Sequence, residues 1–328
     1  MIIIRADANE HIGTGHVMRC LSVAQAFVDK GEKVLFVTAD HRGDRLIKQQ
    51  GFDVACLNTE WTNMESEELD KFVKECKPNL LLIDSYYVTE QYLDRLRNVV
   101  TTAYFDDLNE KYWNVDYLIN YNIYAGVFDY SRYHDANTEL LLNPRYAPLR
   151  EEFKNCPKHE IKRVSDILIS AGGGDPEHVF EKIMSGICLD MKEIVFHFIV
   201  GALNPRLDDI KVLAKDKKNI VLHINEKHMS DLMRNCDIAV SAAGTTLYEL
   251  CATGIPTITY TLANNQLVAA EQFGKQGIML SSGDCREDEG FIGRVKTNIE
   301  KLTGDIELRR GLSIKMQHLV DGNGAKNC

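Results

Sequence analysis

A short loop with two glycines, IGTGHVMRC at residues 12–20, joins an extended apolar run to a helical pattern. The extended run is residues 1–5, apolar up to Arg5, and a polar loop, residues 6–10, follows it. After the loop, apolar residues recur at the spacing that buries one face of a helix. Gly13 and Gly15 carry no Cβ, so the turn can tighten and a ligand can approach the backbone closely. The sequence therefore predicts a strand, a ligand-accessible turn and a helix.

His16 lies at or near the first turn of this predicted helix. The free N–H groups and the positive dipole end at a helix N-terminus favour an anion and disfavour an imidazolium. A neutral imidazole beside a bound anion can act as a general base near neutral pH. The alternative is a structural loop in which the histidine only caps the helix.

Size and charge limit the class of protein. The chain has 328 residues, 45% of them hydrophobic and 26% charged, which suits a soluble protein of two ordinary domains. The net charge of −10 argues against a nucleic-acid partner, because duplex binding depends on clustered Lys and Arg. It gives no support for attachment to an anionic membrane surface.

Targeting and metal signals are missing from the sequence pattern. Residues 1–4 are too short for the apolar core of a signal peptide, and no apolar run approaches the roughly 18 residues of a membrane span. The nine cysteines include no C-x-x-C pair, which predicts reduced thiols in a cytoplasmic protein. The ten histidines lack metal-ligand spacing, so we expect no metal.

Strands and helices alternate along the first half of the chain. The predicted strands are residues 1–5, 32–38, 53–57, 79–83, 101–105 and 117–120. Helices are predicted after the opening loop and at residues 43–50, 65–75 and 90–98. Residues 121–150 show little periodicity, and residues 151–163 read as the passage between domains.

The alternation resumes in the second half. Strands are predicted at residues 165–170, 194–200, 220–223, 237–241 and 256–260, and helices at residues 177–189, 207–214, 229–235, 247–252 and 266–275, with a mainly helical remainder to residue 320. This order predicts two doubly wound α/β domains with parallel sheets, residues 1–147 and 148–328. In such a fold a ligand is expected in a cleft at the carboxyl ends of the strands.

Two loops of the second half suit phosphate. Residues 170–176 contain Gly172, Gly173 and Gly174 and precede a helix, so their amides can form an anion nest; a tight structural turn is the alternative. The second loop opens a helix with Gly244, Thr245 and Thr246, which offer two hydroxyls and free amides to a diphosphate.

Glu249 lies one helical turn after Thr246 and can accept both hydroxyl protons of a ribose. Thr246 and Glu249 can instead form a capping box, and the two interpretations are compatible. Further on, Asn265 and Gln266 begin another helix, where their amides can meet phosphate or sugar hydroxyls or serve as an ordinary N-cap.

Polar residues also follow the strands of the first half. Residues 84–87 (DSYY) and 106–107 (DD) come directly after apolar strands, so they are candidate substrate contacts or solvated loops. We find no carboxylate pair at the spacing of a glycosidase dyad and no Gly-x-Ser-x-Gly elbow.

Taken together, the motifs resemble a known family. Arg5-Ala6-Asp7 followed by IGTGH at residues 12–16 is similar to the signature of the UDP-sugar hydrolases of pseudaminic acid biosynthesis. Residues 146–150, 172–175, 243–249 and 321–325 extend the likeness over nearly the whole chain. The resemblance implies a GT-B fold, with two Rossmann-like domains as in the peptidoglycan N-acetylglucosaminyltransferase. The Gly-Thr-Thr-x-x-Glu element is shared with many GT-B enzymes, so it indicates the donor class more than the reaction.

The resemblance also implies roles for single residues. His16 would be the catalytic residue, and the substrate would contact the loop of Asp7, Gly13 and Gly15 and the segment around Asn265. Tyr86 and Gln266 are expected substrate contacts because of their positions after a strand and at the start of a helix. UDP would bind Gly172, Gly173, Gly174, Ile224, Gly244, Thr245, Thr246 and Glu249, with Glu249 on the ribose.

The expected function is hydrolysis of a UDP-linked diacetamido-trideoxy sugar. With His16 as base, water attacks the anomeric carbon and inverts it, without metal or cofactor, in a pathway to flagellar or other surface polysaccharides. An inverting GT-B glycosyltransferase using a UDP-amino sugar donor and a non-catalytic UDP-sugar-binding protein are the alternatives.

Overall fold

The computed structural model describes residues 1–9, 11–63, 67–172, 174–201, 204–286 and 290–328. The chain divides into two compact units. The first contains residues 1–150 and 323–328, and the second contains residues 151–322. None of the helices in these described ranges is long and apolar enough to cross a membrane.

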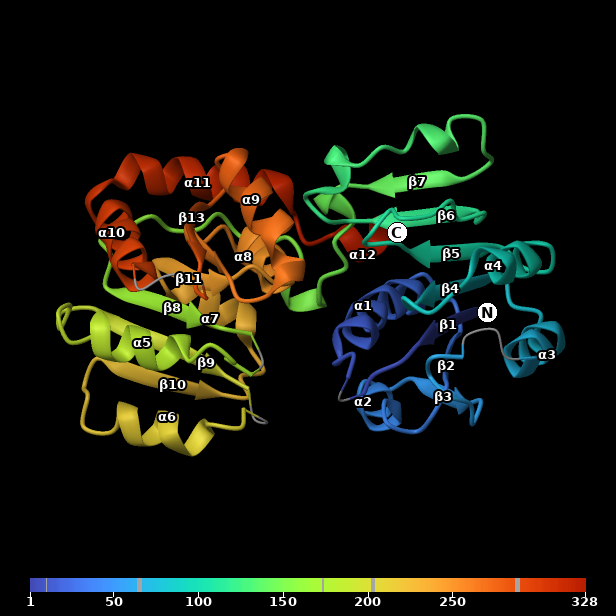
Figure 1. Cartoon of the computed structure of the whole chain (residues 1–328), viewed down its shortest axis with the longest axis horizontal. Helices are drawn as coiled ribbons and strands as arrows, with labels where there is room; N and C mark the ends of the chain where they lie inside the picture. Colours follow the sequence, from blue (N-terminus) through green and yellow to red (C-terminus); the bar gives the residue numbers. More distant parts are fainter. Residues whose placement is uncertain (10, 64–66, 173, 202–203, 287–289) are drawn as a thin grey trace. The chain divides into compact units, whose positions relative to one another are not determined.

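The first unit is built on a seven-stranded parallel sheet with the order β3-β2-β1-β4-β5-β6-β7 (Figure 1). Its strands are β1 (Ile2–Ala6), β2 (Val34–Thr38), β3 (Asp53–Cys56), β4 (Leu80–Asp84), β5 (Thr102–Phe105), β6 (Tyr117–Asn120) and β7 (Glu139–Leu142). The helices are α1 (Gly15–Asp29), α2 (Asp44–Gln49), α3 (Glu67–Cys76), α4 (Glu90–Arg97) and α12 (Gly324–Asn327), with short 3₁₀ turns η1 (Ala125–Val127), η2 (Ser131–Tyr133) and η3 (Pro144–Tyr146).

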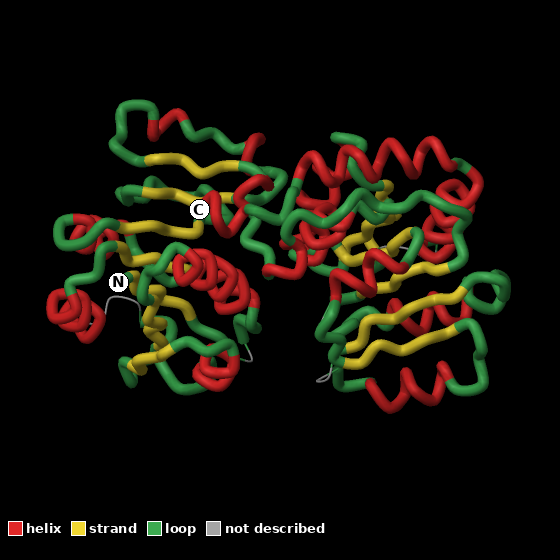
Figure 2. The backbone as a smooth tube through the Cα atoms, turned by 180° about the vertical axis from the view of Figure 1, so that it is seen from behind, coloured by secondary structure: helices red, strands yellow, loops and turns green. Residues whose placement is uncertain are grey.

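The second unit is built on a six-stranded parallel sheet with the order β10-β9-β8-β11-β12-β13, whose strands lie side by side in Figure 2. Its strands are β8 (Asp166–Ser170), β9 (Val195–Val200), β10 (Ile220–Ile224), β11 (Ile238–Ala242), β12 (Thr257–Thr261) and β13 (Leu280–Asp284). The helices are α5 (Val179–Gly186), α6 (Leu207–Ala214), α7 (Met229–Asn235), α8 (Thr246–Thr253), α9 (Leu267–Lys275), α10 (Phe291–Gly304) and α11 (Ile306–Leu319), with 3₁₀ turns η4 (Glu151–Phe153) and η5 (Asn264–Gln266).

The predicted fold class is confirmed, because both sheets are parallel and both are doubly wound. Each sheet has its own apolar core, and every residue of the central strands β1 and β11 is buried. The strand order reverses between β1 and β4 in the first sheet and between β8 and β11 in the second sheet. Crevices outside the carboxyl ends of the strands at such a reversal are the usual ligand sites of this architecture.

Two strands lie where the sequence did not predict them. β7 falls in the region of residues 121–150 that lacks periodicity, and β13 falls in the stretch expected to be helical. Both are edge strands of four or five residues, and β13 contains Ser281, Ser282 and Gly283, which have low strand propensity. Pairing with the neighbouring strand, rather than local preference, therefore sets their conformation.

The last residues return to the first unit, whereas the sequence placed them in the second domain. The amide of Asn327 donates to the carbonyl of Arg145 at 3.1 Å, and the Cys328 thiol donates to the carbonyl of Tyr146 at 3.3 Å. Gly324 lies so close to Ala147 that an added Cβ would come within 2.1 Å of its carbonyl oxygen. Helix α12 thus packs on η3 and α1, a long-range contact without a local sequence signal.

Candidate functional site

The loop before α1 presents His16 at the carboxyl ends of β1 and β4. Asn9 closes the loop, because its backbone pairs with Gly13 and its side-chain oxygen accepts from the amides of His11 and Ile12. Gly13 has a φ of +71°, which favours glycine, and α1 begins two residues later at Gly15. His16 is the second residue of α1 and is buried. It does not cap the helix, because Thr14 is the N-cap and the His16 ring turns toward β4.

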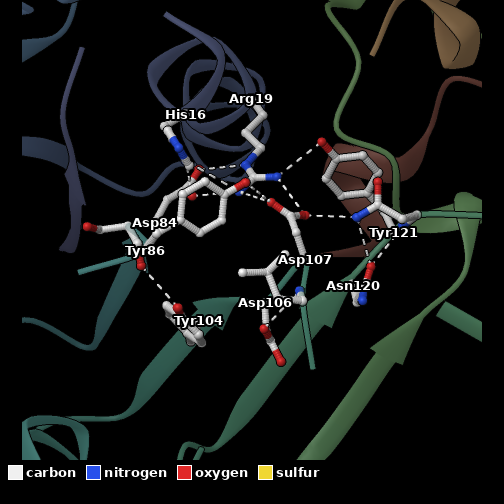
Figure 3. A network of polar contacts seen from close by, with 12 residues as sticks. His16, Arg19, Asp84, Tyr86, Tyr104, Asp106, Asp107, Asn120 and Tyr121 are labelled. Carbon is white, nitrogen blue, oxygen red and sulfur yellow. Dashed lines mark hydrogen bonds and ion pairs between the residues drawn. The ribbon is translucent and has the colours of Figure 1, made fainter. Parts of the chain in front are cut away.

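Asp84, the last residue of β4, orients the imidazole (Figure 3). His16 Nδ1 and Asp84 Oδ1 lie 2.6 Å apart, and the Asp84 side chain has no exposure to solvent. A carboxylate at Nδ1 fixes the tautomer in which Nδ1 carries the proton and Nε2 carries the lone pair. None of the described residues hydrogen-bonds to Nε2, so the basic nitrogen is available to a ligand or a water.

Arg19 fixes the charge of Asp84. Its Nε lies 2.6 Å from Asp84 Oδ2, and its Nη2 lies 2.6 Å from Oδ1. Burial alone would raise the pKa of Asp84, but the Arg19 charge, together with hydrogen bonds from Arg19 and His16, holds that pKa well below its usual value. Asp84 is therefore an ionised acceptor of a bidentate arginine contact and a histidine contact.

A second carboxylate, Asp107, completes the network. Arg19 donates to Asp107 Oδ1 at 3.0 Å and to the Tyr121 hydroxyl at 3.2 Å, and its guanidinium lies 4.7 Å from the centre of the Phe105 ring. Asp107 also accepts from Asn122 Nδ2 at 2.8 Å and from the Tyr86 hydroxyl at 2.9 Å. With His16 neutral, the Arg19 and two carboxylate charges sum to −1, and protonation of His16 brings the sum to zero. The network can thus stabilise an imidazolium formed during a reaction.

A small pocket lies beside the imidazole in the first unit. Its lining residues are Asp7, Ile12, His16, Trp61, Asp84, Ser85, Tyr86 and Tyr87. The Tyr86 ring meets the His16 ring edge to face, with centroids 4.9 Å apart. The predicted substrate contacts Asp7 and Tyr86 therefore lie at the His16 pocket.

Asp7 is engaged by the protein itself. Its Oδ2 accepts from Arg5 Nη1 at 2.6 Å, and its Oδ1 accepts from the Ala39 amide at 2.8 Å. These contacts anchor the loop after β1 to β2, so the first role of Asp7 is to hold the loop. Gly13 and Gly15 are exposed, and a Cβ added at either would meet no other atom within 4 Å.

In the second unit, the loop after β11 has the features expected of a diphosphate site. The amides of Gly244, Leu247 and Tyr248 bond to carbonyls of residues 242–245. By contrast, no described group accepts from the amides of Thr245 and Thr246. Two unused amides and two hydroxyls at the positive end of α8 form a site that favours an anion.

The alternative interpretation, a capping box of Thr246 and Glu249, does not match the structure. Thr245, not Thr246, is the N-cap of α8, and its side chain caps no amide. Glu249 lies in the first turn of α8 and is half-buried. The structure also brings the segment at η5 to this loop, because a Cβ at Gly244 would lie 4.0 Å from Gln266 Nε2. Gln266 Oε1 accepts from the Leu262 amide at 2.9 Å, and Asn265 is exposed.

The glycine loop after β8 differs from the expected nest at a helix N-terminus. Helix α5 begins at Val179, and Asp175 accepts from the amides of Val179 and Phe180 at 2.8 and 3.0 Å. The first two amides of the helix therefore already hold a carboxylate. Gly172 and Gly174 are exposed, and Gly173 lies outside the described residues. Ile224, at the end of β10, is 40% exposed.

The sequence predicts no role for Arg19 or Asn122, and it indicates that Asp84 and Asp107 are candidate substrate contacts or solvated loop residues. One signal was present for Arg19, which lies three residues after His16 and so on the same face of α1. Among the described residues, no group of three or more His, Cys, Asp and Glu side chains is placed to hold a metal ion. All nine cysteines are free thiols.

Known proteins resemble this chain in sequence. No protein-family model matches it. It is 29% identical to the UDP-2,4-diacetamido-2,4,6-trideoxy-β-L-altropyranose hydrolase of Campylobacter jejuni over 280 residues, which cover 84% of this chain and 97% of that protein. It is 25% identical to an uncharacterized protein of Methanocaldococcus jannaschii over 281 residues, 81% of this chain but only 56% of that relative.

Among solved structures, the chain superposes on MurG of Acinetobacter baumannii with a TM-score of 0.71. The match covers 99% of this chain and 97% of that one at 14% identity, so it establishes the fold alone. The resemblance indicated by the sequence motifs is confirmed: the chain is similar in sequence to a UDP-diacetamido-trideoxy-sugar hydrolase, and its fold is that of the GT-B glycosyltransferases.

Proposed function

We propose that this protein hydrolyses a UDP-linked 2,4-diacetamido-2,4,6-trideoxy sugar and releases UDP and the free sugar. The Campylobacter relative supports an enzyme that processes UDP-sugars. The observation that carries the reaction class is the 2.6 Å contact between His16 Nδ1 and Asp84, which leaves Nε2 as a base in a pocket. A base paired with a buried carboxylate suits the activation of water.

The proposed step balances as an inverting displacement. A water oxygen forms the new bond to the anomeric carbon while His16 Nε2 takes a water proton. The bond between the anomeric carbon and the diphosphate oxygen breaks, and its electron pair stays on UDP. The imidazolium is held by Asp84, whose charge Arg19 maintains. A positioned general base typically contributes a factor of about 10²–10⁴ to the rate.

The second unit is proposed to hold the nucleotide. The amides and hydroxyls of Thr245 and Thr246 would stabilise the charge that develops on the leaving diphosphate. Glu249 would accept hydrogen bonds from the ribose, as sequence analysis predicts. We propose that these donors make a divalent metal unnecessary, so activity should persist in excess EDTA.

One isotope experiment tests the proposal. The purified protein is incubated with the UDP-diacetamido-trideoxy sugar in H₂¹⁸O, without an acceptor, and the products are analysed by mass spectrometry. We expect label in the released sugar and none in UDP, with inverted anomeric configuration by NMR at early times. Label in UDP would show cleavage at phosphorus and refute the mechanism. The His16→Asn variant should retain UDP binding and lose turnover.

An inverting glycosyltransferase is the second candidate, because MurG has the same fold and His16 could equally activate an acceptor hydroxyl. This alternative predicts slow or absent hydrolysis until an acceptor is added. UDP binding without turnover of the sugar nucleotide would instead indicate a binding protein.

A further inference from the structure

Aromatic side chains, half-buried in the case of Trp61 and exposed in the case of Tyr86 and Tyr87, line the His16 pocket. Trp61 stacks on the His11 ring with a centroid distance of 5.9 Å and an interplanar angle of 9°, and it meets the Tyr87 ring edge to face at 4.9 Å. Tyr86 and Tyr87 are 51% and 41% exposed. Trp61, Tyr86 and Tyr87 all line the pocket that contains His16. These rings lie outside the apolar core of the first unit, so core packing does not account for them.

Most polar side chains of this pocket have hydrogen-bond partners within the protein, including Ser85, whose hydroxyl accepts from the Tyr87 amide at 3.2 Å. Both oxygens of Asp7 and of Asp84 accept hydrogen bonds from the protein, and the Tyr86 hydroxyl donates to Asp107. Three groups have no hydrogen-bond partner among the described residues: His16 Nε2, the Trp61 indole N–H and the Tyr87 hydroxyl. Aromatic rings beside a few unused polar groups are a common feature of small-molecule sites. The enclosed volume of this pocket is about 10 Å³, which is room for one water, so a sugar would lie on the exposed faces of the rings.

We propose that Trp61 and Tyr87 form a subsite, the aromatic subsite, that selects sugars carrying acetamido and deoxy groups. This inference rests on the proposed function and names the substituents of the sugar that the aromatic subsite would contact. Acetamido methyl groups and a C6 methyl group are apolar and gain by packing on aromatic rings. An acetamido carbonyl accepts a hydrogen bond, which the indole N–H of Trp61 can donate. A fully hydroxylated sugar lacks these methyl groups and the acetamido carbonyl, so it makes less apolar contact with the rings and offers a different acceptor to the indole N–H.

The two tryptophans of the chain allow a direct binding assay. Trp113 is 6% exposed and packs on Tyr104, and its buried indole nitrogen has no hydrogen-bond partner, so Trp113→Phe is a mild substitution. In that variant all tryptophan emission comes from Trp61. We expect the free 2,4-diacetamido-2,4,6-trideoxy sugar to shift this emission in a saturable way, and glucose at the same concentration to leave it unchanged.

Kinetics provide the second readout. We expect Trp61→Ala to lower kcat/KM for the diacetamido-trideoxy sugar nucleotide by about 10- to 100-fold, as apolar pocket contacts typically do. Trp61→Phe should recover most of the ring contact but not the hydrogen bond, and so fall between Trp61→Ala and the wild type. UDP affinity by calorimetry should stay at the wild-type value in both variants, because the proposed nucleotide contacts belong to the second unit. Melting curves and circular dichroism of each variant report that the first unit is folded.

The outcomes separate this inference from the proposed function. Equal emission shifts with both sugars, or unchanged kcat/KM in folded Trp61→Ala, would overturn the aromatic subsite. If the protein releases no sugar from the sugar nucleotide but Trp61 still responds selectively to the free diacetamido sugar, hydrolysis fails and the subsite stands. If hydrolysis proceeds and Trp61 gives no response, the subsite fails and hydrolysis stands.

Discussion

Replacement of Asp84 by asparagine tests whether the carboxylate acts through His16. The amide side chain has nearly the same shape, but it carries no charge to fix the His16 tautomer or to stabilise the imidazolium. Asp84 accepts from His16 Nδ1, from Arg19 Nε and Nη2 at 2.6 Å each, and from the Cys20 thiol at 3.5 Å. The substitution therefore removes the negative charge beside the Arg19 guanidinium and beside the His16 imidazole.

The magnitude follows from these contacts. If Asp84 makes His16 an effective base, kcat should fall by about 10²–10⁴, which corresponds to roughly 3–5 kcal/mol in the activation free energy. Breaking one side of a buried ion pair costs about 3–5 kcal/mol in stability, but Asp107 still neutralises Arg19, so we expect the lower end. At about 2–4 °C per kcal/mol, the melting temperature should fall by roughly 6–12 °C.

The assay is UDP release from the sugar nucleotide, measured below the melting transition of each variant. Asp107→Asn is the matched control, because Asp107 contacts Arg19 and Tyr86 but not His16. It should lose stability with a much smaller loss of kcat. UDP affinity should be unchanged in both variants, since the proposed nucleotide contacts belong to the second unit.

A double-mutant cycle gives the refuting result. If Asp84 works only through the imidazole, adding Asp84→Asn to His16→Ala should cost little further activity, so the two effects should be far from additive. Additive losses, or full kcat in folded Asp84→Asn, would show that the 2.6 Å contact does not serve the reaction.

Three further predictions concern other parts of the chain. Burial lowers the pKa of His159 from 6.5 to about 4, so between these pH values the unfolded chain binds more protons than the folded chain. The free energy of unfolding therefore falls as the pH falls from 6.5 to 4. His159→Phe should remove up to about 3 kcal/mol of that loss, measured by urea titrations at the two pH values. Gly322 has a φ of +78°, and an added Cβ would lie 2.0 Å from the Phe153 carbonyl oxygen, so Gly322→Ala should lower the free energy of unfolding by more than about 2 kcal/mol. Gly126→Ala is the control: an added Cβ there meets no atom within 4 Å, so the free energy of unfolding should change by less than about 0.5 kcal/mol. Glu249→Gln should weaken UDP binding about tenfold or more, measured by calorimetry, because a charged hydrogen-bond acceptor is lost. Glu271→Gln is the control: it breaks only an exposed ion pair with Lys275, so the UDP affinity should stay unchanged.

Local patterns were sufficient to predict most of the architecture. The apolar run at residues 79–83 indicates a strand buried on both faces, and the alternation of such strands with helices implies parallel sheets. The loop with His16 and the loop with Gly244 to Thr246 could also be found by residue type and spacing alone. These features are readable because a strand, a helix start or a glycine turn depends on residues a few positions apart.

Tertiary structure decided which side chains act together. His16 meets Asp84 across 68 positions, and Arg19 meets Asp107 across 88, because the order of strands in the sheet places the ends of β1, β4 and β5 side by side. Contacts between distant segments also place α12 on η3 and pair the edge strands β7 and β13 with their neighbours in the sheets. In the loop after β8, Asp175 has a φ of +46° and accepts hydrogen bonds from two helix amides, and neither feature was predicted from the sequence. Pairings between distant segments arise from packing of the whole sheet, so they leave no periodic trace in the sequence.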